Sequence, residues 1–288
     1  MLIQPSYAKI NLALDVVARR PDGWHELESI LVPIDWHDLV AVRVRPSESS
    51  SATLRLTGEV PPDLPDDDTN LALRAVARLS ELARVPLAAE IWVDKRVPVE
   101  AGLGGGSSNA ATVLRSGAAQ LAALGVHIDH DALTRAAMQI GSDVPALLAG
   151  GAQRVRGLGE RLEPLTIRER HLAVAVAGAS STAASYSALQ PSEITESGRI
   201  ARVASALREG GLRDDDLGSA LEAGARRAAP LLAQSIERLR ALTPARRWHL
   251  TGSGGALFCV AQDTTDAASV AARVREHGFA SRACHTVA

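Results

Sequence analysis

The sequence is poor in lysine, cysteine and aromatic residues. Only Lys9 and Lys95 are lysines among 31 basic side chains, and the other 29 are arginines. In a sequence that uses arginine for ordinary surface charge, the few lysines are enriched at positions that need a compact ammonium group. Ala8 and Asp94 precede the two lysines, so neither belongs to the Gly-Lys-Ser/Thr of a Walker A loop. The chain therefore lacks the commonest phosphate-binding motif.

The two cysteines, Cys259 and Cys284, are too few for a disulfide framework or a four-cysteine zinc site, and they suit a reducing compartment. The longest stretch without a charge, Leu172 to Ser192, is interrupted by Gly178 and Pro191 and does not resemble a membrane span. The formal net charge is −2, which gives no basic field for nucleic acid or anionic lipid. We expect a cytoplasmic protein with no nucleic-acid or membrane partner.

The pattern of apolar residues predicts an α+β protein in two domains, residues 1–165 and 166–288. The first would hold strands at 7–17, 39–45, 52–57 and 91–93, helices at 70–85, 109–124 and 131–140, a further helix from about 143, and a hairpin at 150–165. The second would hold a strand at 172–177, helical structure from 197 to 242, a glycine-rich loop between two strands at 251–255, a helix at 265–277 and a last strand.

In the first predicted strand, apolar and polar residues alternate. The strand is expected to be half buried and to show Lys9 and Asn11 side by side on its polar face. Lys9 could stabilise charge on a phosphoryl group, or it could be a solvated basic residue. Trp24 and His25 follow a turn directly. They could form a flat stacking face beside a hydrogen-bonding ring, or a surface pair without function.

The segment Gly102–Asn109 has four glycines in its first five positions, followed by Ser107, Ser108 and Asn109. Such a backbone can approach a ligand closely, and the start of the following helix favours an anion. This composition predicts a phosphate-binding loop, with a capped flexible turn as the alternative. It is not a dinucleotide fingerprint, since Ser107 or Asn109 stands where the third glycine would be.

Asp143 lies in the segment Gly141-Ser142-Asp143-Val144-Pro145. It could be a helix N-cap, or a carboxylate that accepts or orients the proton of a hydroxyl nucleophile. His127 and His130 are three apart, but no third ligand is near them in the sequence. We expect no protein-bound metal site from the histidines.

Together these segments resemble the GHMP kinases. The resemblance is carried by Ala8–Leu12, Arg20–Leu27, Pro98–Asn109, Gly141–Pro145, Gly157–Leu162 and Thr251–Gly254. It implies an N-terminal domain with a ribosomal-protein-S5-like fold and a C-terminal ferredoxin-like domain, with the active site between them. It also implies ATP and Mg²⁺, and phosphorylation of the 2-hydroxyl of a small-molecule substrate, a methylerythritol linked to cytidine diphosphate.

The resemblance assigns roles residue by residue. The catalytic residues would be Lys9 and Asp143. The ATP-phosphate loop would be Pro98, Val99, Glu100, Ala101, Gly102, Leu103, Gly104, Gly105, Gly106, Ser107 and Ser108. Asn70 and Lys95 would lie near the adenine and ribose, and Asn11 would line the methylerythritol site.

The cytosine base would be bound by His25 and two stacking aromatic residues. The family usually has tyrosine at the position of Trp24, so stacking is kept here but a phenolic hydrogen bond is lost. Tyr186 is the only Tyr or Phe between Tyr7 and Phe258, so we assign it as the second stacking residue. Two alternatives remain at this stage: another small-molecule GHMP kinase of the homoserine or mevalonate type, and a non-catalytic nucleotide-binding protein.

Overall fold

The computed structural model describes residues 3–287, which form two compact units. The first unit contains residues 3–8, Trp36–Val99 and Gly104–Ala149, and the second contains Lys9–Asp35, Glu100–Leu103 and residues 150–287. Two long strands, β1 (Ile3–Arg19) and β2 (His25–Pro46), contribute residues to both units. The predicted strands at 7–17 and 39–45 are therefore parts of longer ones.

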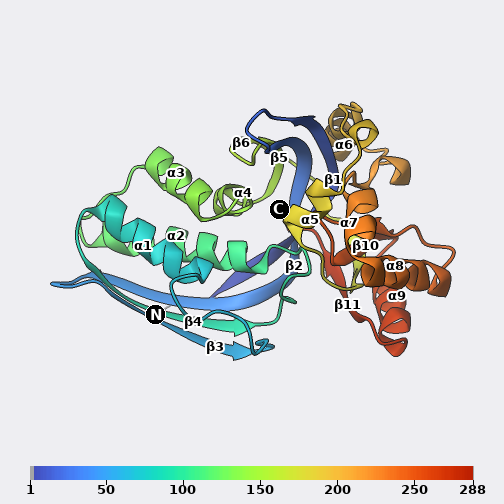
Figure 1. The fold of residues 1–288 in the computed structure, drawn as a ribbon. Coiled ribbons are helices and arrows are strands. Elements are labelled where there is room, and N and C mark those ends of the chain that lie inside the picture. Colours follow the sequence, from blue (N-terminus) through green and yellow to red (C-terminus); the bar gives the residue numbers. More distant parts are fainter. Residues whose placement is uncertain (1–2, 288) are drawn as a thin grey trace. The chain divides into compact units, whose positions relative to one another are not determined.

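In the first unit, helices cover one face of a sheet (Figure 1). The elements that lie wholly in this unit are β3 (Ser51–Gly58), α1 (Leu71–Ala83), β4 (Leu87–Lys95), α2 (Gly105–Ala123), α3 (His130–Ile140) and α4 (Val144–Ala149). Strand β4 pairs in parallel with β3 and antiparallel with β2. Every second residue of β4 is buried, the period-2 pattern of a strand with one covered face. Helix α2 packs closely on α1 because Gly117 has no side chain that would meet Leu79.

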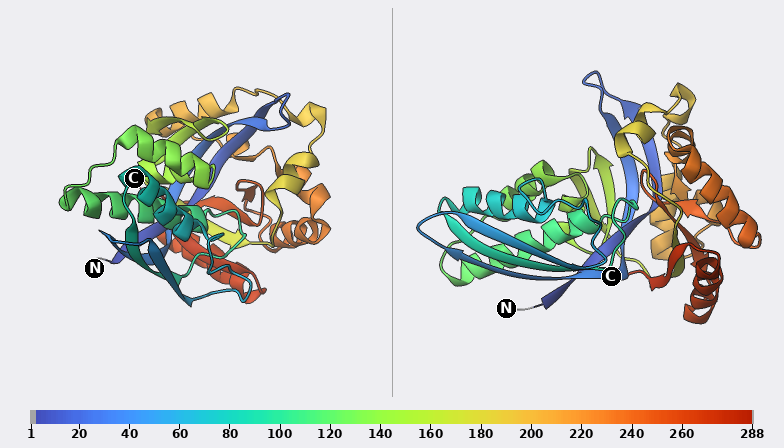
Figure 2. Two further views of the ribbon diagram at one scale, coloured as in Figure 1. Left: turned by 60° about the vertical axis from the view of Figure 1, so that its left-hand side comes forward. Right: turned by 60° about the horizontal axis from the view of Figure 1, so that its bottom comes forward.

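The second unit is built around a four-stranded antiparallel sheet in the order β11-β7-β10-β9, with α9 against β7 and β11 (Figure 2). Its strands are β5 (Ala152–Gly157), β6 (Arg161–Leu165), β7 (His171–Val176), β8 (Gly218–Ser219), β9 (His249–Leu250), β10 (Ala256–Ala261) and β11 (Ala280–His285). Its helices are α5 (Thr182–Ser187), η1 (Pro191–Glu193), α6 (Arg199–Glu209), η2 (Asp214–Asp216), α7 (Glu222–Ala228), α8 (Pro230–Leu242) and α9 (Thr264–Glu276). The hairpin predicted at 150–165 is confirmed, because β5 and β6 pair antiparallel.

The helical structure predicted for residues 197–242 is confirmed as α6, α7 and α8, but it is interrupted between α6 and α7. Helix α6 ends at Glu209; its C-cap residue, Gly210, has a left-handed φ of +96°, and Gly218 has a φ of +98°. Such backbone is open mainly to glycine and cannot continue a helix. The short strand β8 pairs in parallel with β1 at Ala13 and Leu14, and Pro230 then begins α8. The helical pattern is therefore broken locally at Gly210 and Gly211, before the chain pairs with β1.

Candidate functional site

The predicted pair Lys9 and Asn11 lies on β1 in the second unit. Each side chain is only 4% exposed, and Lys9 Nζ donates a hydrogen bond to Asn11 Oδ1 at 2.9 Å. The backbone N–H of Asn11 donates to Thr251 Oγ1 at 2.7 Å. The polar face of this strand is therefore covered, and the alternative of Lys9 as a solvated surface charge is wrong. A buried ammonium needs polar partners, and Asn11 supplies one.

Residues Glu100–Leu103, which include the first glycine of the Gly102–Asn109 segment, pack within the second unit. Lys9 N–H donates to Leu103 O and Ala256 N–H donates to Ala101 O, both at 2.8 Å. Gly102 has a φ of +74°, and a Cβ there would lie 2.5 Å from the carbonyl oxygen of Gly254. Glycine is thus required at position 102 for two reasons: the positive φ and the close approach of the Gly254 carbonyl. The loop Thr251–Gly255 and the segment Glu100–Leu103 are held together by these contacts.

The end of the glycine segment, Gly104–Ser108, belongs to the first unit and begins α2. Gly104 is the N-cap residue with a φ of +69°. Helix α2 starts at Gly105, two residues earlier than the hydroxyl residues that we expected to open it. The free N–H groups of its first turn are donors for an anion. Ser108 is buried and its hydroxyl accepts a hydrogen bond from Ser6 Oγ at 2.8 Å.

Lys95 lies at the end of β4 and forms a buried ion pair with Asp38. Asp38 is fully buried and also accepts hydrogen bonds from Val97 N–H at 2.8 Å and from Asn109 Nδ2 at 3.1 Å. A buried carboxylate is stable only with several such donors. Lys95 Nζ would lie 3.3 Å from a Cβ at Gly105, so the ion pair supports the first turn of α2.

Three other residues predicted to bind ATP also lie in the first unit. Asn70 is the N-cap of α1: its Oδ1 accepts from Ala72 N–H at 3.0 Å and its Nδ2 donates to Pro65 O at 2.7 Å. Both polar groups of the Asn70 side chain therefore form hydrogen bonds that cap α1 and hold the preceding loop. Pro98 and Val99 are half-buried and lie between β4 and the glycine segment.

Asp143 is half-buried and directly precedes α4, where its backbone carbonyl accepts from Leu147 N–H at 3.1 Å. Gly141, two residues earlier, approaches α2 closely, since a Cβ there would lie 3.8 Å from Ser107 Oγ. The first unit therefore brings the Asp143 segment beside the phosphate-loop helix. The two segments that sequence analysis predicted for proton acceptance and for phosphate binding are thus neighbours in this unit.

The residues predicted to bind cytosine lie in the second unit. The rings of His25, at the start of β2, and Tyr186, on α5, are in contact, with centroids 5.2 Å apart and planes at 32°. Burial, and then the nearby positive charge of Arg19, lower the pKa of His25 below its ordinary value. The imidazole is therefore neutral at neutral pH and has one donor and one acceptor nitrogen. Trp24 is 66% exposed, so its indole ring is accessible to a ligand.

Sequence reasoning missed two buried polar residues of these clusters, Asp38 and Ser29. Asp38 directly precedes the apolar run Leu39–Val42, and an acidic residue at the edge of such a run was the only available signal. Ser29 is 1% exposed and bonds to Asn11, but a serine in a strand carries no such signal.

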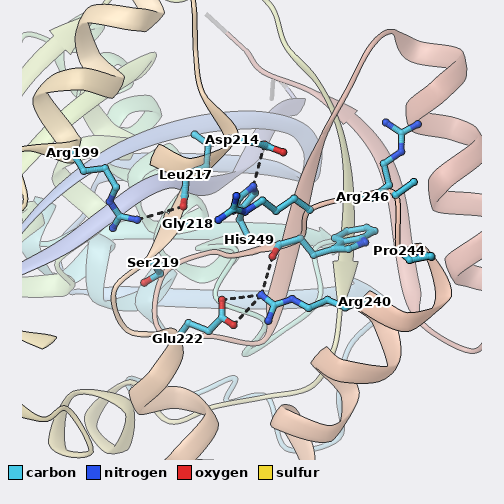
Figure 3. Close-up of a pocket in the computed structure, with 13 residues that line it drawn as sticks. Arg199, Asp214, Leu217, Gly218, Ser219, Glu222, Arg240, Pro244, Arg246 and His249 are labelled. Carbon is cyan, nitrogen blue, oxygen red and sulfur yellow. Dashed lines mark hydrogen bonds and ion pairs between the residues drawn. The ribbon is translucent and has the colours of Figure 1, made fainter.

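The second unit also contains a pocket of about 760 Å³ beside α6, β8 and β9, lined by four arginines (Figure 3). Each guanidinium group already pairs with a carboxylate; the pairs are Arg199–Asp15, Arg240–Glu222, Arg246–Asp266 and Arg247–Asp215. These ion pairs leave little uncompensated positive charge for an anion. We assign no ligand to this pocket.

His249 lines the same pocket, and its titration makes stability depend on pH. Burial lowers its pKa below the ordinary 6.5, although Asp214 opposes this shift. The unfolded chain therefore takes up a proton at a pH where the folded chain does not, and stability is lost as the pH falls below about 6.5. We expect Tm to fall less steeply between pH 7.5 and 5.5 in His249→Gln than in the wild type. The exposed histidine variant His127→Gln should keep the wild-type slope, and equal slopes in all three proteins would contradict the assignment.

Within residues 3–287, no helix is long and apolar enough to cross a membrane. The same residues contain no cluster of three or more His, Cys, Asp or Glu side chains that could hold a metal ion. Burial raises the pKa of the Cys259 thiol to about 12, so this cysteine is not a nucleophile at neutral pH.

Comparison with known proteins identifies two family domains in this chain. Residues 70–151 match the GHMP kinases N terminal domain and residues 187–280 match the GHMP kinases C terminal domain. The 4-diphosphocytidyl-2-C-methyl-D-erythritol kinase of Xanthomonas axonopodis pv. citri (strain 306) is 35% identical over 88% of this chain and 80% of its own length. The kinase of the same name from Pelotomaculum thermopropionicum is 36% identical over 93% of this chain and 92% of its own length.

Solved structures agree with these relatives. A crystal structure of 4-(cytidine 5'-diphospho)-2C-methyl-D-erythritol kinase matches all of this chain and all of its own with a TM-score of 0.79 at 33% identity. Homoserine kinase from Cytophaga hutchinsonii matches with a TM-score of 0.69 at 16% identity, which shows the shared fold alone. The predicted two-domain α+β fold is confirmed, and the chain belongs to the GHMP kinases, in the group of the 4-diphosphocytidyl-2-C-methyl-D-erythritol kinases.

Proposed function

We propose that the protein transfers the γ-phosphate of ATP to the 2-hydroxyl of 4-diphosphocytidyl-2-C-methyl-D-erythritol, in the non-mevalonate route to isopentenyl diphosphate. The observation that carries this proposal is the 35–36% identity to kinases of that name over most of the chain. The contact between His25 and Tyr186 supports it, since the substrate has a base to stack and homoserine or mevalonate has none.

Phosphoryl transfer depends mainly on positioning of the reactants and on stabilisation of charge. Each residue of the site is therefore assigned to one of these two roles. The N–H groups at the start of α2 bind the β- and γ-phosphates. Asp143 accepts or orients the proton of the 2-hydroxyl, and Lys9 stabilises the charge on the transferring phosphoryl group. Retention of both Lys9 and Asp143 argues against a non-catalytic nucleotide-binding protein, which needs neither.

The start of α2 fits a Mg²⁺ ion bound together with the phosphates of ATP. The Ser107 hydroxyl lies in the first turn of this helix, beside the N–H groups assigned to the phosphates. Mg²⁺ keeps several waters in protein sites and is bound in large part through substrate phosphates. The Ser107 hydroxyl would hold it there, the ion would supply neutralisation of phosphate charge, and Asp143 would keep its role toward the 2-hydroxyl.

The test of this function is ADP release from ATP and Mg²⁺ in the presence of the cytidyl substrate, with homoserine and mevalonate in parallel reactions. We expect turnover with the cytidyl substrate alone. Turnover with homoserine or mevalonate instead would replace the substrate assignment. Binding of ATP without turnover in any reaction would support the non-catalytic alternative.

Removal of either stacking ring should weaken binding of the cytidyl substrate specifically. Trp24→Ala and Tyr186→Ala are each expected to raise its KM about tenfold, because base–aromatic stacking contributes about 1–3 kcal/mol per base. The KM for ATP should stay within about twofold. Leu231→Ala, which removes another exposed apolar side chain of the second unit, is the control and should change neither constant. Equal increases in both KM values would contradict the stacking role.

A further inference from the structure

A chain of three buried hydrogen bonds leads away from Lys9 through the second unit. Lys9 Nζ donates to Asn11 Oδ1 at 2.9 Å, and Asn11 Nδ2 donates to Ser29 Oγ at 2.7 Å. Ser29 Oγ then donates to the carbonyl oxygen of Ala13 at 2.9 Å. Lys9, Asn11 and Ser29 are all nearly inaccessible to solvent, so water does not compete for these bonds.

The groups at the two ends of this series of hydrogen bonds fix the donor and the acceptor of every bond in it. The carbonyl of Ala13 can only accept, so the Ser29 hydroxyl must donate its one hydrogen there. Ser29 Oγ is left as an acceptor, so the amide of Asn11 must present its NH₂ group to it. The oxygen of that amide is then turned toward Lys9, whose ammonium can only donate.

The Thr251–Gly255 loop closes over the same residues and restricts them further. Thr251 Oγ1 holds the backbone N–H of Asn11 at 2.7 Å. A Cβ on Gly252 would lie 3.4 Å from Lys9 Nζ and 3.3 Å from Asn11 Oδ1. The amide and the ammonium therefore have little room to move, and the orientation of the amide decides whether they attract or repel.

We propose that Ser29 is a positioning residue for phosphoryl transfer, acting on the Lys9 ammonium through the amide of Asn11. The catalytic consequence rests on the proposed function, but the positioning itself does not. On this assignment Asn11 contributes to the reaction mainly as the acceptor that holds Lys9. Ser29 contributes by preventing rotation of that amide, although it touches neither the substrate nor Lys9.

The variant Ser29→Ala removes the hydroxyl and leaves the Asn11 amide without its fixed partner. The amide can then rotate and turn its NH₂ group toward the ammonium, which places donor against donor. We expect kcat to fall about tenfold, the effect of losing one well-placed hydrogen bond to a charged group. The KM for ATP should stay within about twofold, because Ser29 is buried in the second unit, whereas the N–H groups assigned to the ATP phosphates begin α2 in the first. Ser29→Thr keeps the oxygen and should restore most of kcat.

The lysine content allows a direct test that does not depend on turnover. Protein labelled with ¹³C and ¹⁵N only in lysine gives side-chain signals from Lys9 and Lys95 alone. In Ser29→Ala, the Cε and Nζ signals of Lys9 should shift or broaden, whereas those of Lys95, which is ion-paired in the first unit, should stay in place. Ser281→Ala is the matched control, because Ser281 is also a buried serine that donates to a carbonyl, that of Ala271, at 2.6 Å. It should leave both lysine signals unchanged.

The two measurements separate this proposal from the proposed function. Unchanged Lys9 signals together with wild-type kcat in Ser29→Ala would overturn the positioning role. A loss of kcat that Ser281→Ala matches would also overturn it, since this would reflect general destabilisation. If the wild type does not phosphorylate the cytidyl substrate, the substrate assignment fails, and the lysine signals still decide whether Ser29 positions Lys9.

Discussion

Replacement of Asp143 by asparagine is expected to lower kcat about 100-fold or more while the KM for ATP stays within about twofold. Asparagine keeps the size of the side chain and removes the negative charge that accepts or orients the hydroxyl proton. Positioned general bases contribute on the order of 10²- to 10⁴-fold. The phosphate-binding N–H groups of α2 are not changed by the substitution, so binding of ATP should persist. Steady-state turnover with both substrates varied measures the two effects separately.

Asp129→Asn is the matched control for this prediction. Asp129 caps α3 in the same unit, with its side chain accepting a hydrogen bond from Ala132 N–H at 2.8 Å. If Asp143 were only a helix cap, the two variants would behave alike, with Tm and turnover both close to the wild-type values, because asparagine caps a helix about as well as aspartate. That result would end the catalytic assignment of Asp143. A large loss of kcat in Asp143→Asn alone would support it.

The parts of the site that lie on one continuous segment could be predicted from sequence. The glycines of Gly102–Asn109 demand unusual backbone, and the serines that follow favour a helix start, so loop and helix were both expected. Only the first residue of α2 was misplaced, because Gly105 and Gly106 have helical backbone despite their weak helix propensity. The N–H groups that they leave free are what the phosphate-binding prediction requires.

The burial of Lys9 could not be predicted in this way. An alternating strand shows which residues share a face, but it does not show what covers that face. The cover includes Thr251 and Gly252, some 240 residues further along the chain. The same limit applies to Ser29, whose partner Asn11 is 18 residues away on another strand. Short strands such as β8 are also invisible locally, because they are set by pairing with β1.

Substitution of Lys9 by arginine, which conserves the charge, should nevertheless abolish most activity. The Lys9 ammonium occupies a closed space, with Asn11 Oδ1 at 2.9 Å and the position of a Cβ on Gly252 at 3.4 Å. A guanidinium group is larger and planar, and its donors point in fixed directions. It cannot take the place of a compact ammonium there without displacing the Thr251–Gly255 loop.

We therefore expect Lys9→Arg to lower kcat about 100-fold or more, comparable with the loss of one positioned donor to transition-state charge. Lys9→Met, which removes the charge and keeps the length, should be at least as impaired. Lys95→Arg is the comparison, since Lys95 is also buried but pairs with Asp38 beneath the start of α2. That variant should act mainly on Tm and on the KM for ATP. Wild-type kcat in Lys9→Arg would mean that any positive charge at this position suffices, and the role of Ser29 and Asn11 in holding a compact ammonium would fail with it.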